Sequence, residues 1–162
     1  ALRDAIAWAA ASGMAHIAVL GISLGAATAI LTVKDQPVEA LVTWSAVPDM
    51  RKLLESHVGV DPIKPPRQAV FEYDGWQIES EFGADALQYD VMNAMRELTL
   101  PKFIVQGTAD APVFVDGFHA FRDVVTPPAD FMEIPEAGHT FQRPQHRHQV
   151  IRQTVIWLKR HF

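Results

Sequence analysis

The chain contains no cysteine among its 162 residues. Disulfides, thiolate metal sites and a cysteine nucleophile are therefore excluded, and the composition suits a reducing compartment, so we expect a cytoplasmic protein. Positive charge is also scarce, because 14 Lys and Arg residues stand against 19 Asp and Glu residues, a formal net charge of −5. This balance disfavours nucleic acid or an anionic membrane as a partner, and it favours a small neutral or apolar ligand.

Long apolar runs are lacking as well. The run that most resembles a membrane span covers residues 17–33, but Gly21, Ser23 and Gly25 interrupt it. It is also shorter than the roughly 20 residues that a bilayer requires, so we interpret it as a strand, a turn and a buried helix. We expect no membrane partner. The chain opens on Ala1 without the basic start of a signal peptide, and a missing N-terminal portion is therefore expected.

The remaining composition is that of a globular protein, with 49% apolar and 20% charged residues. Short apolar runs predict four buried strands, and apolar residues at helical spacing predict helices between them. Parallel neighbours need crossover connections that are usually helical, so the alternation predicts an α/β fold, a three-layer sandwich with a mostly parallel sheet. The strands are expected at 16–20, 40–44, 103–106 and 131–134, and the helices at 2–12, 24–33, 84–98 and 116–124, with a last helix carrying Ile151, Val155, Leu158 and Phe162 on one face.

The segment at about 48–83 differs in character from the rest of the chain. It holds prolines at 62, 65 and 66 and several aromatic residues, and two extended pieces flank Asp74-Gly75, a favoured hairpin turn. We therefore expect one domain over residues 1–162, with this segment as a cap-like insertion.

The segment Gly21-Ile22-Ser23-Leu24-Gly25 fits the pattern G-x-S-x-G. A strand is predicted to run into it and a helix of small residues to leave it, which is the setting of a nucleophile elbow. The sharp turn holds the serine in a strained backbone conformation, and the two glycines provide clearance for it. The first free N–H groups of the helix, beginning with that of Leu24, can donate to a developing oxyanion. The alternative is a serine that only caps the helix.

A serine hydroxyl is a poor nucleophile near neutral pH and needs a general base together with a group that orients the base. Asp110 follows the predicted strand at 103–106, and His139 follows the strand at 131–134. Both therefore lie at the carboxyl edge of the sheet, where open α/β folds build their sites. Each residue alone is more simply a turn former or a solvated loop side chain. Together they complete the chain order Ser23, Asp110, His139 that accompanies a nucleophile elbow.

On these residues, the chain from about residue 17 to its end resembles the α/β-hydrolase family, especially its esterase, dienelactone-hydrolase-like and serine-aminopeptidase-like branches. The segments that carry the resemblance are V-L-G-I-S-L-G-A-A-T-A, F-I-V-Q-G-T-A-D and I-P-E-A-G-H-T-F. The resemblance implies that Ser23 attacks the substrate carbonyl, that His139 takes and returns the proton, and that Asp110 fixes the imidazole tautomer. It also makes the Leu24 N–H group one oxyanion donor.

Two other carboxylates compete for the role of the acid. Asp49 follows the strand before the insertion, where some members of the family carry their acid, and Asp116 lies a few residues beyond Asp110. Within the insertion, the resemblance assigns four aromatic residues to a small cap that walls the substrate pocket, namely Phe71, Tyr73, Trp76 and Phe82, of which Phe71 and Trp76 are the main candidates. The alternative is that these aromatic residues bury one another and hold the hairpin to the body.

The chain departs from the family before the elbow. Family members bring several strands and an oxyanion loop ahead of it, and no such segment precedes His16 here, so the fold class is an α/β-hydrolase fold lacking its N-terminal strands. We expect the strand that leads to Ser23 to be an unpaired edge. We also expect these 162 residues alone to be weakly active or inactive, with the missing segment required for the second oxyanion donor. After Asp110, the proline is displaced from the D-x-x-V-P pattern common in the family.

The expected function is that of a serine hydrolase that cleaves a carboxylic ester through an acyl-enzyme. No metal and no organic cofactor is expected, since His146 and His148 lack acidic companions. A serine aminopeptidase-like peptidase is an alternative, because the same three residues serve amides. A non-catalytic, hydrolase-like binding scaffold is another. The expected partner is a small-molecule ester or peptide substrate.

Overall fold

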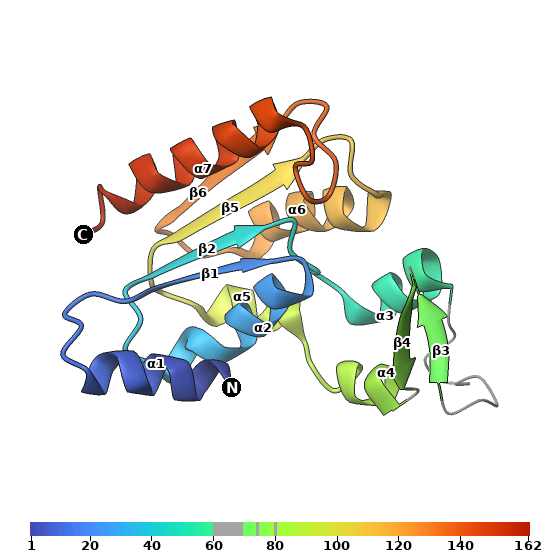
Figure 1. Ribbon diagram of the computed structural model, residues 1–162, viewed down its shortest axis with the longest axis horizontal. Helices are drawn as coiled ribbons and strands as arrows, with labels where there is room; N and C mark the ends of the chain where they lie inside the picture. Colours follow the sequence, from blue (N-terminus) through green and yellow to red (C-terminus); the bar gives the residue numbers. More distant parts are fainter. Residues whose placement is uncertain (60–69, 74, 80) are drawn as a thin grey trace.

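The computed structural model of the protein describes residues 1–59, 70–73, 75–79 and 81–162 (Figure 1). Its main sheet has four strands in the order β1-β2-β5-β6, and every neighbouring pair is parallel. The two central strands are buried along almost their whole length, as expected for a sheet that is covered on both faces. The predicted parallel α/β sheet is thus confirmed. The strands are β1 (Ala18–Ile22), β2 (Ala40–Trp44), β5 (Lys102–Gly107) and β6 (Ala129–Ile134).

Helices form a layer on each face of this sheet, which confirms the three-layer sandwich (Figure 1). Four helices pack on one face around a large apolar cluster, and a single helix packs on the other face over a smaller one. None of the helices in the described parts of the chain has the length and apolar character of a membrane span. The first group is α1 (Leu2–Ala11), α2 (Leu24–Thr32), α5 (Val91–Glu97) and α6 (Pro112–Val124), and the single helix is α7 (Pro144–Leu158).

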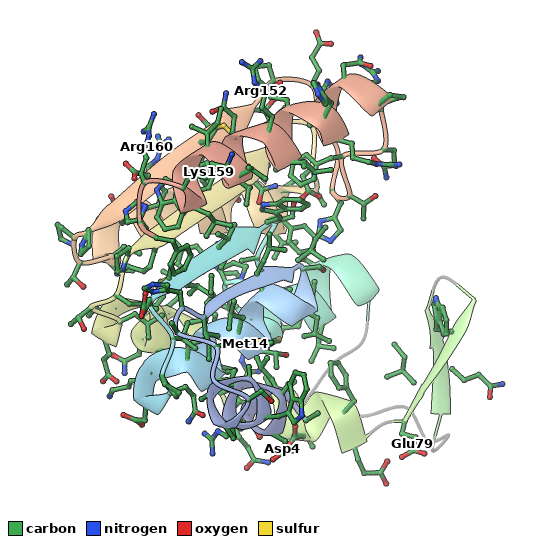
Figure 2. All side chains as sticks on the ribbon, turned by 60° about the vertical axis from the view of Figure 1, so that its left-hand side comes forward. Asp4, Met14, Glu79, Arg152, Lys159 and Arg160 are labelled. Atoms are coloured by element: carbon green, nitrogen blue, oxygen red, sulfur yellow. The ribbon has the colours of Figure 1, made fainter. Side chains whose placement is uncertain are left out.

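The segment between β2 and α5 contains a hairpin of its own. Its two strands are antiparallel, and Gly75 in the turn has a φ of 80°. The predicted hairpin is confirmed, while its role as a cap stays a prediction. The hairpin, marked by Glu79 in Figure 2, lies apart from the main sheet in both views. The short elements outside the main layers are η1 (Val33–Asp35), α3 (Met50–Lys52), η2 (Leu53–Val58), β3 (Val70–Tyr73), β4 (Trp76–Glu79) and α4 (Glu81–Ala86).

Several predicted boundaries were wrong. The single helix expected at 84–98 is two helices, because the Asp90 side chain accepts a hydrogen bond from the Asn93 N–H group at 2.9 Å and starts α5. Helix α6 begins at Pro112 rather than at 116, since proline suits the first helical position, where no N–H donor is needed. Strand β1 begins two residues later than expected, at Ala18.

The last helix packs on the sheet through a different face from the one expected. Val150, Thr154 and Trp157 are buried. By contrast, Ile151 and Val155, which belong to the predicted apolar stripe, are 46% and 45% exposed. The basic side chains of Arg152 and Arg160 extend outward from α7 (Figure 2).

The edge strand β1 also carries exposed apolar side chains. Leu20 and Ile22 of β1 are 47% and 37% exposed. They pair in register with Val42 and Trp44, which belong to the cluster under α7, so the apolar side chains of β1 face the same layer as α7. β1 is hydrogen-bonded to β2 alone within the described sheet, so its outer edge and this apolar face are both open. The predicted unpaired edge strand is therefore present.

Candidate active site

Ser23 occupies the turn between β1 and α2. Its φ of 54° and ψ of −125° lie outside the regions that side-chain-bearing residues favour, which is the strained conformation expected of a nucleophile elbow. The Ser23 N–H group donates to the Trp44 carbonyl at 2.9 Å and so ties the turn to β2.

The two glycines of the elbow do not contribute equally to this turn. A Cβ atom at Gly21 would lie 2.5 Å from the Gly25 carbonyl oxygen and 2.6 Å from the Ala26 Cα, closer than real atoms approach. A Cβ atom at Gly25 would meet nothing within 4 Å. The expectation that both glycines provide clearance was therefore wrong for Gly25, and only Gly21 is required by close approach.

The structure brings Ser23, His139 and Asp110 together in one chain of contacts. Ser23 Oγ lies 2.8 Å from His139 Nε2, and His139 Nδ1 lies 2.8 Å from Asp110 Oδ2. The three residues leave the carboxyl ends of β1, β6 and β5, so the topology alone gathers them at one edge of the sheet.

Electrostatics fix the direction of these hydrogen bonds. Burial on its own raises the pKa of Asp110, whose side chain is 2% exposed. Hydrogen bonds from His139 and Gln106 outweigh burial and hold the pKa below its ordinary value. An ionised carboxylate can only accept, so His139 Nδ1 carries the proton and Nε2 is free to accept from the Ser23 hydroxyl. This tautomer can remove the Ser23 proton during an attack on a substrate.

The Asp110 carboxylate is hydrogen-bonded by a second side chain, that of Gln106, which sequence reasoning missed. The Gln106 side-chain amide donates to Asp110 Oδ2 at 2.8 Å, and the Ala111 N–H group donates to Asp110 Oδ1 at 2.7 Å. Gln106 is 2% exposed and stands near the end of a strand that is otherwise almost wholly apolar. A polar residue at that place in a buried strand was the available signal for it.

The loop that carries the base is supported by three further residues that sequence reasoning missed. The Ser45 hydroxyl donates to the His139 carbonyl at 2.8 Å. Thr108 Oγ1 accepts from the Glu136 N–H group at 2.9 Å, and the Phe114 ring lies 4.1 Å from the imidazole between centroids. These contacts join residues that are far apart in sequence, so no local pattern could have identified them.

The N–H group of Leu24 begins α2, one residue after the nucleophile. Within the described parts of the chain no acceptor lies within hydrogen-bonding distance of it, as is normal for the first N–H groups of a helix. This N–H group is therefore available as a donor next to Ser23.

Solved structures with the same arrangement of strands and helices are hydrolases. The esterase domain of a Rhodothermus marinus protein matches with a TM-score of 0.77 and 19% identity, over 98% of this chain and 67% of that one. Est1E from Butyrivibrio proteoclasticus, bound to ferulic acid, matches with a TM-score of 0.75 and 18% identity, over 94% of this chain and 65% of the Est1E chain. An alpha/beta hydrolase from a Penicillium species, GrgF, matches with a TM-score of 0.71 and 15% identity, over 99% and 70%.

The chain has the α/β-hydrolase fold. The matches include almost all of this chain. They include about two thirds of the Rhodothermus marinus esterase domain and of Est1E, which agrees with an α/β-hydrolase fold without all of its strands. No protein-family model matches the sequence, and no curated protein is significantly similar to it.

The two other candidate acids lie elsewhere in this α/β-hydrolase fold. Asp49 caps α3, because its Oδ1 accepts from the Lys52 N–H group at 3.1 Å. Asp116 is exposed on α6. In the described residues neither carboxylate is hydrogen-bonded to His139, whereas Asp110 is.

The role of Phe71 and Trp76 in the wall of a substrate pocket stays a prediction. Trp76 is 74% exposed. The side chain of Phe71 lies outside the described residues. Phe82, at the start of α4, does line a cavity.

That cavity has a volume of about 620 Å³, and Leu24, the residue after Ser23, is part of its lining. Its apolar lining comes from α1, α2 and the segment between β2 and α5, and the polar part of its wall includes charged residues of α1 and α4. The lining includes Leu24, Leu31, Met50, Phe82 and Ala86, and also Arg3, Asp4 and Asp85.

Metal ligands were not expected. In the part of the chain that the structure describes, no group of three His, Asp or Glu side chains is placed to hold a metal ion. His146 is buried on α7 and His148 is exposed.

Proposed function

We propose that the protein is a serine hydrolase that cleaves carboxylic esters through an acyl-enzyme intermediate. The observation that carries the proposal is the chain of two 2.8 Å contacts from Ser23 Oγ through the imidazole of His139 to the carboxylate of Asp110. A nucleophile, a base and an orienting acid at the carboxyl edge of an α/β-hydrolase sheet are the parts that acyl transfer to water requires.

The proposed reaction has two halves. Ser23 Oγ attacks the ester carbonyl carbon while His139 Nε2 takes the hydroxyl proton, and the Leu24 N–H group donates to the resulting oxyanion. The tetrahedral intermediate collapses, the C–O bond to the alcohol breaks, and His139 returns the proton to the leaving oxygen. Water then attacks the acyl group on Ser23 with the same proton transfers, which releases the acid and restores the hydroxyl. Asp110 keeps the imidazole oriented and stabilises its charged form.

The substrate class follows from the cavity beside Leu24. Much of its lining is apolar, and its volume of about 620 Å³ suits a medium-sized organic group. Because Leu24, the residue after Ser23, lines this cavity, we propose that it holds the acyl part of an apolar ester. The similarity to Est1E, whose structure contains ferulic acid, supports an ester of an organic acid.

The open edge of β1 adds a requirement. Leu20 and Ile22 leave an apolar surface on a strand whose outer edge is unpaired, and the oxyanion donor proposed above is the Leu24 N–H group. We propose that the working enzyme includes a further segment that pairs with β1 and supplies a second donor. Removal of one such donor elsewhere costs about a hundred- to thousand-fold in rate, so the 162 residues alone are expected to be slow.

A fluorophosphonate probe tests the proposal, since it reacts covalently with activated serines. We expect the full-length protein to be labelled, Ser23→Ala to abolish labelling, and Ser12→Ala, at an exposed serine beyond α1, to leave it intact. Hydrolysis of p-nitrophenyl acetate is then compared with hydrolysis of an aminoacyl anilide, since the same three side chains could serve amides. Labelling that survives in Ser23→Ala would contradict the proposal, and a folded full-length protein that is never labelled would favour the binding scaffold.

A further inference from the structure

Ser45 is the first residue after β2, the strand between the one that leads to Ser23 and the one that leads to Asp110. It is 0% exposed, and its φ of 47° lies in the left-handed region that side-chain-bearing residues rarely adopt. A buried, left-handed serine at the carboxyl edge of the sheet is a conformation that the surrounding contacts must maintain.

Those contacts join Ser45 to the base. Its N–H group donates to the Val105 carbonyl at 2.9 Å, which fixes its main chain to β5. Its hydroxyl then points toward the loop after β6 and donates to the His139 carbonyl at 2.8 Å. The left-handed conformation thus connects a rigid central strand to the loop that carries the imidazole.

The preceding residue makes the matching contact to the nucleophile. The Trp44 carbonyl accepts from the Ser23 N–H group at 2.9 Å. Two consecutive residues at the end of β2 therefore hold the main chains of Ser23 and His139. Since both anchors belong to one peptide segment, they fix the separation between the nucleophile and the base.

The loop of His139 depends on this anchor. Glu136 and Phe141, on either side of the histidine, have φ values of 58° and 51°, so the loop bends sharply twice around it. In the described parts of the chain, the bond from Ser45 is the sole hydrogen bond to the His139 main chain. Thr108 and Ala109 hold the neighbouring residues Glu136 and Ala137, so the bond from Ser45 is the contact that fixes the main chain at His139 itself.

We propose that Ser45 is a positioning residue, whose hydroxyl holds the His139 main chain so that the imidazole lies between Ser23 and Asp110. The role rests on the proposed serine-hydrolase function, because positioning matters where His139 acts as the base. A displacement of about 1 Å in such a site costs on the order of a hundredfold in rate.

The test compares Ser45→Ala with Ser45→Gly. Both variants remove the hydroxyl, but glycine also relieves the left-handed strain, so it should be the more stable of the two. We expect both to slow fluorophosphonate labelling of Ser23 in the full-length protein by about ten- to a hundredfold. We also expect the labelling rate to change its dependence on pH. If Ser45 has a purely structural role, the labelling rate should instead follow the stability of each variant, so that Ser45→Gly is labelled faster than Ser45→Ala. That result would overturn the proposal.

Thr43→Val is the matched control. Thr43 lies two residues earlier in β2 and is 1% exposed, and no partner for its hydroxyl is found among the described residues. Loss of this buried hydroxyl should leave labelling unchanged.

A second readout does not require activity. The proton on His139 Nδ1, shared with Asp110, gives a far-downfield NMR signal, which we expect to shift or broaden in Ser45→Gly and not in Thr43→Val. If the wild-type protein is never labelled, the proposed function fails and this signal still decides the role of Ser45. An unchanged signal in Ser45→Gly overturns that role.

Discussion

Gln106 Nε2 lies 2.8 Å from Asp110 Oδ2, the same carboxylate oxygen that His139 Nδ1 contacts at 2.8 Å. The other oxygen, Oδ1, accepts from the Ala111 N–H group. Three donors thus converge on one buried carboxylate. His139 takes part in the proposed reaction and the Ala111 donor is a main-chain group, so Gln106 is the donor that a substitution can remove by itself. Removal of the Gln106 amide should therefore change the environment of the Asp110 carboxylate while His139 stays present.

Gln106→Leu should lower both stability and activity. The substitution keeps the approximate volume but removes a hydrogen bond to a charged group, which is worth about 1.5–3 kcal/mol. The pKa of Asp110 should rise, because one of the hydrogen bonds that lower it is lost. Urea unfolding measures the stability and fluorophosphonate labelling the activity, with Gln88→Leu as the exposed control. Stability and labelling equal to those of wild type would show that the amide has no influence on the acid.

The acid itself should make stability depend on pH in a defined direction. The folded state holds the pKa of Asp110 below its ordinary value of 3.8, so the unfolded chain binds that proton more readily. The stabilising contribution of Asp110 is therefore complete above pH 3.8 and is lost as the pH falls through the lower folded pKa. In urea titrations from pH 7 downward, wild type should lose more stability below pH 3.8 than Asp110→Asn. Parallel curves would contradict the assignment.

The two elbow glycines should respond differently to alanine. A Cβ atom at Gly21 collides with the main chain of α2, so Gly21→Ala should displace the turn and reduce labelling of Ser23 by at least about a hundredfold. Gly25→Ala meets open space and should leave labelling within a few-fold of wild type. If Gly21→Ala and Gly25→Ala lost labelling equally, the close approach at Gly21 would not explain why glycine is needed in this turn.

The sequence predicts the parts of this fold that depend on local patterns. Short apolar runs mark the four parallel strands, and the glycines and small residues around Ser23 mark the elbow, because these signals arise within a few residues of one another. The candidate site could also be predicted, because Ser23, Asp110 and His139 each follow a strand and the carboxyl ends of parallel strands lie at one edge of the sheet. The break before α5 was missed although Asp90 was a visible cap, because apolar spacing continued across it.

What could not be predicted depends on tertiary contacts. Ser45 reaches His139 across 94 residues of chain, and no spacing in the sequence encodes that distance. The buried face of α7 was also misjudged. Ile151 and Val155 are apolar at helical spacing, yet they are exposed, while Thr154 is buried and its hydroxyl accepts a hydrogen bond from the Trp44 indole.

The open edge should make these 162 residues self-associate when they are studied alone. Leu20 is 47% exposed on a strand whose outer edge is unpaired, a combination that favours edge-to-edge pairing. Leu20→Lys should reduce self-association in sedimentation velocity experiments. Tyr89→Lys replaces a side chain of equal exposure away from the edge and should not. If both variants behave alike, the edge strand is not responsible.

Lys102 gives the last prediction, because it is a cation buried in the sheet. It is 0% exposed, and its Nζ donates to the Leu98 and Leu100 carbonyls at 2.8 and 2.9 Å rather than to a carboxylate. Burial lowers the pKa of Lys102 from 10.5 to about 8.

Between these two pKa values, the unfolded chain holds a proton on Lys102 that the folded state has released. Stability therefore rises with pH across this window, since the unfolded state binds more protons there. Urea unfolding from pH 7.5 to 10 should show this rise in wild type and in Lys52→Met, whose lysine is exposed. Lys102→Met lacks the titrating group, so its stability should fall relative to wild type as the pH increases. A constant difference between Lys102→Met and wild type over that range would mean that the buried ammonium keeps an ordinary pKa.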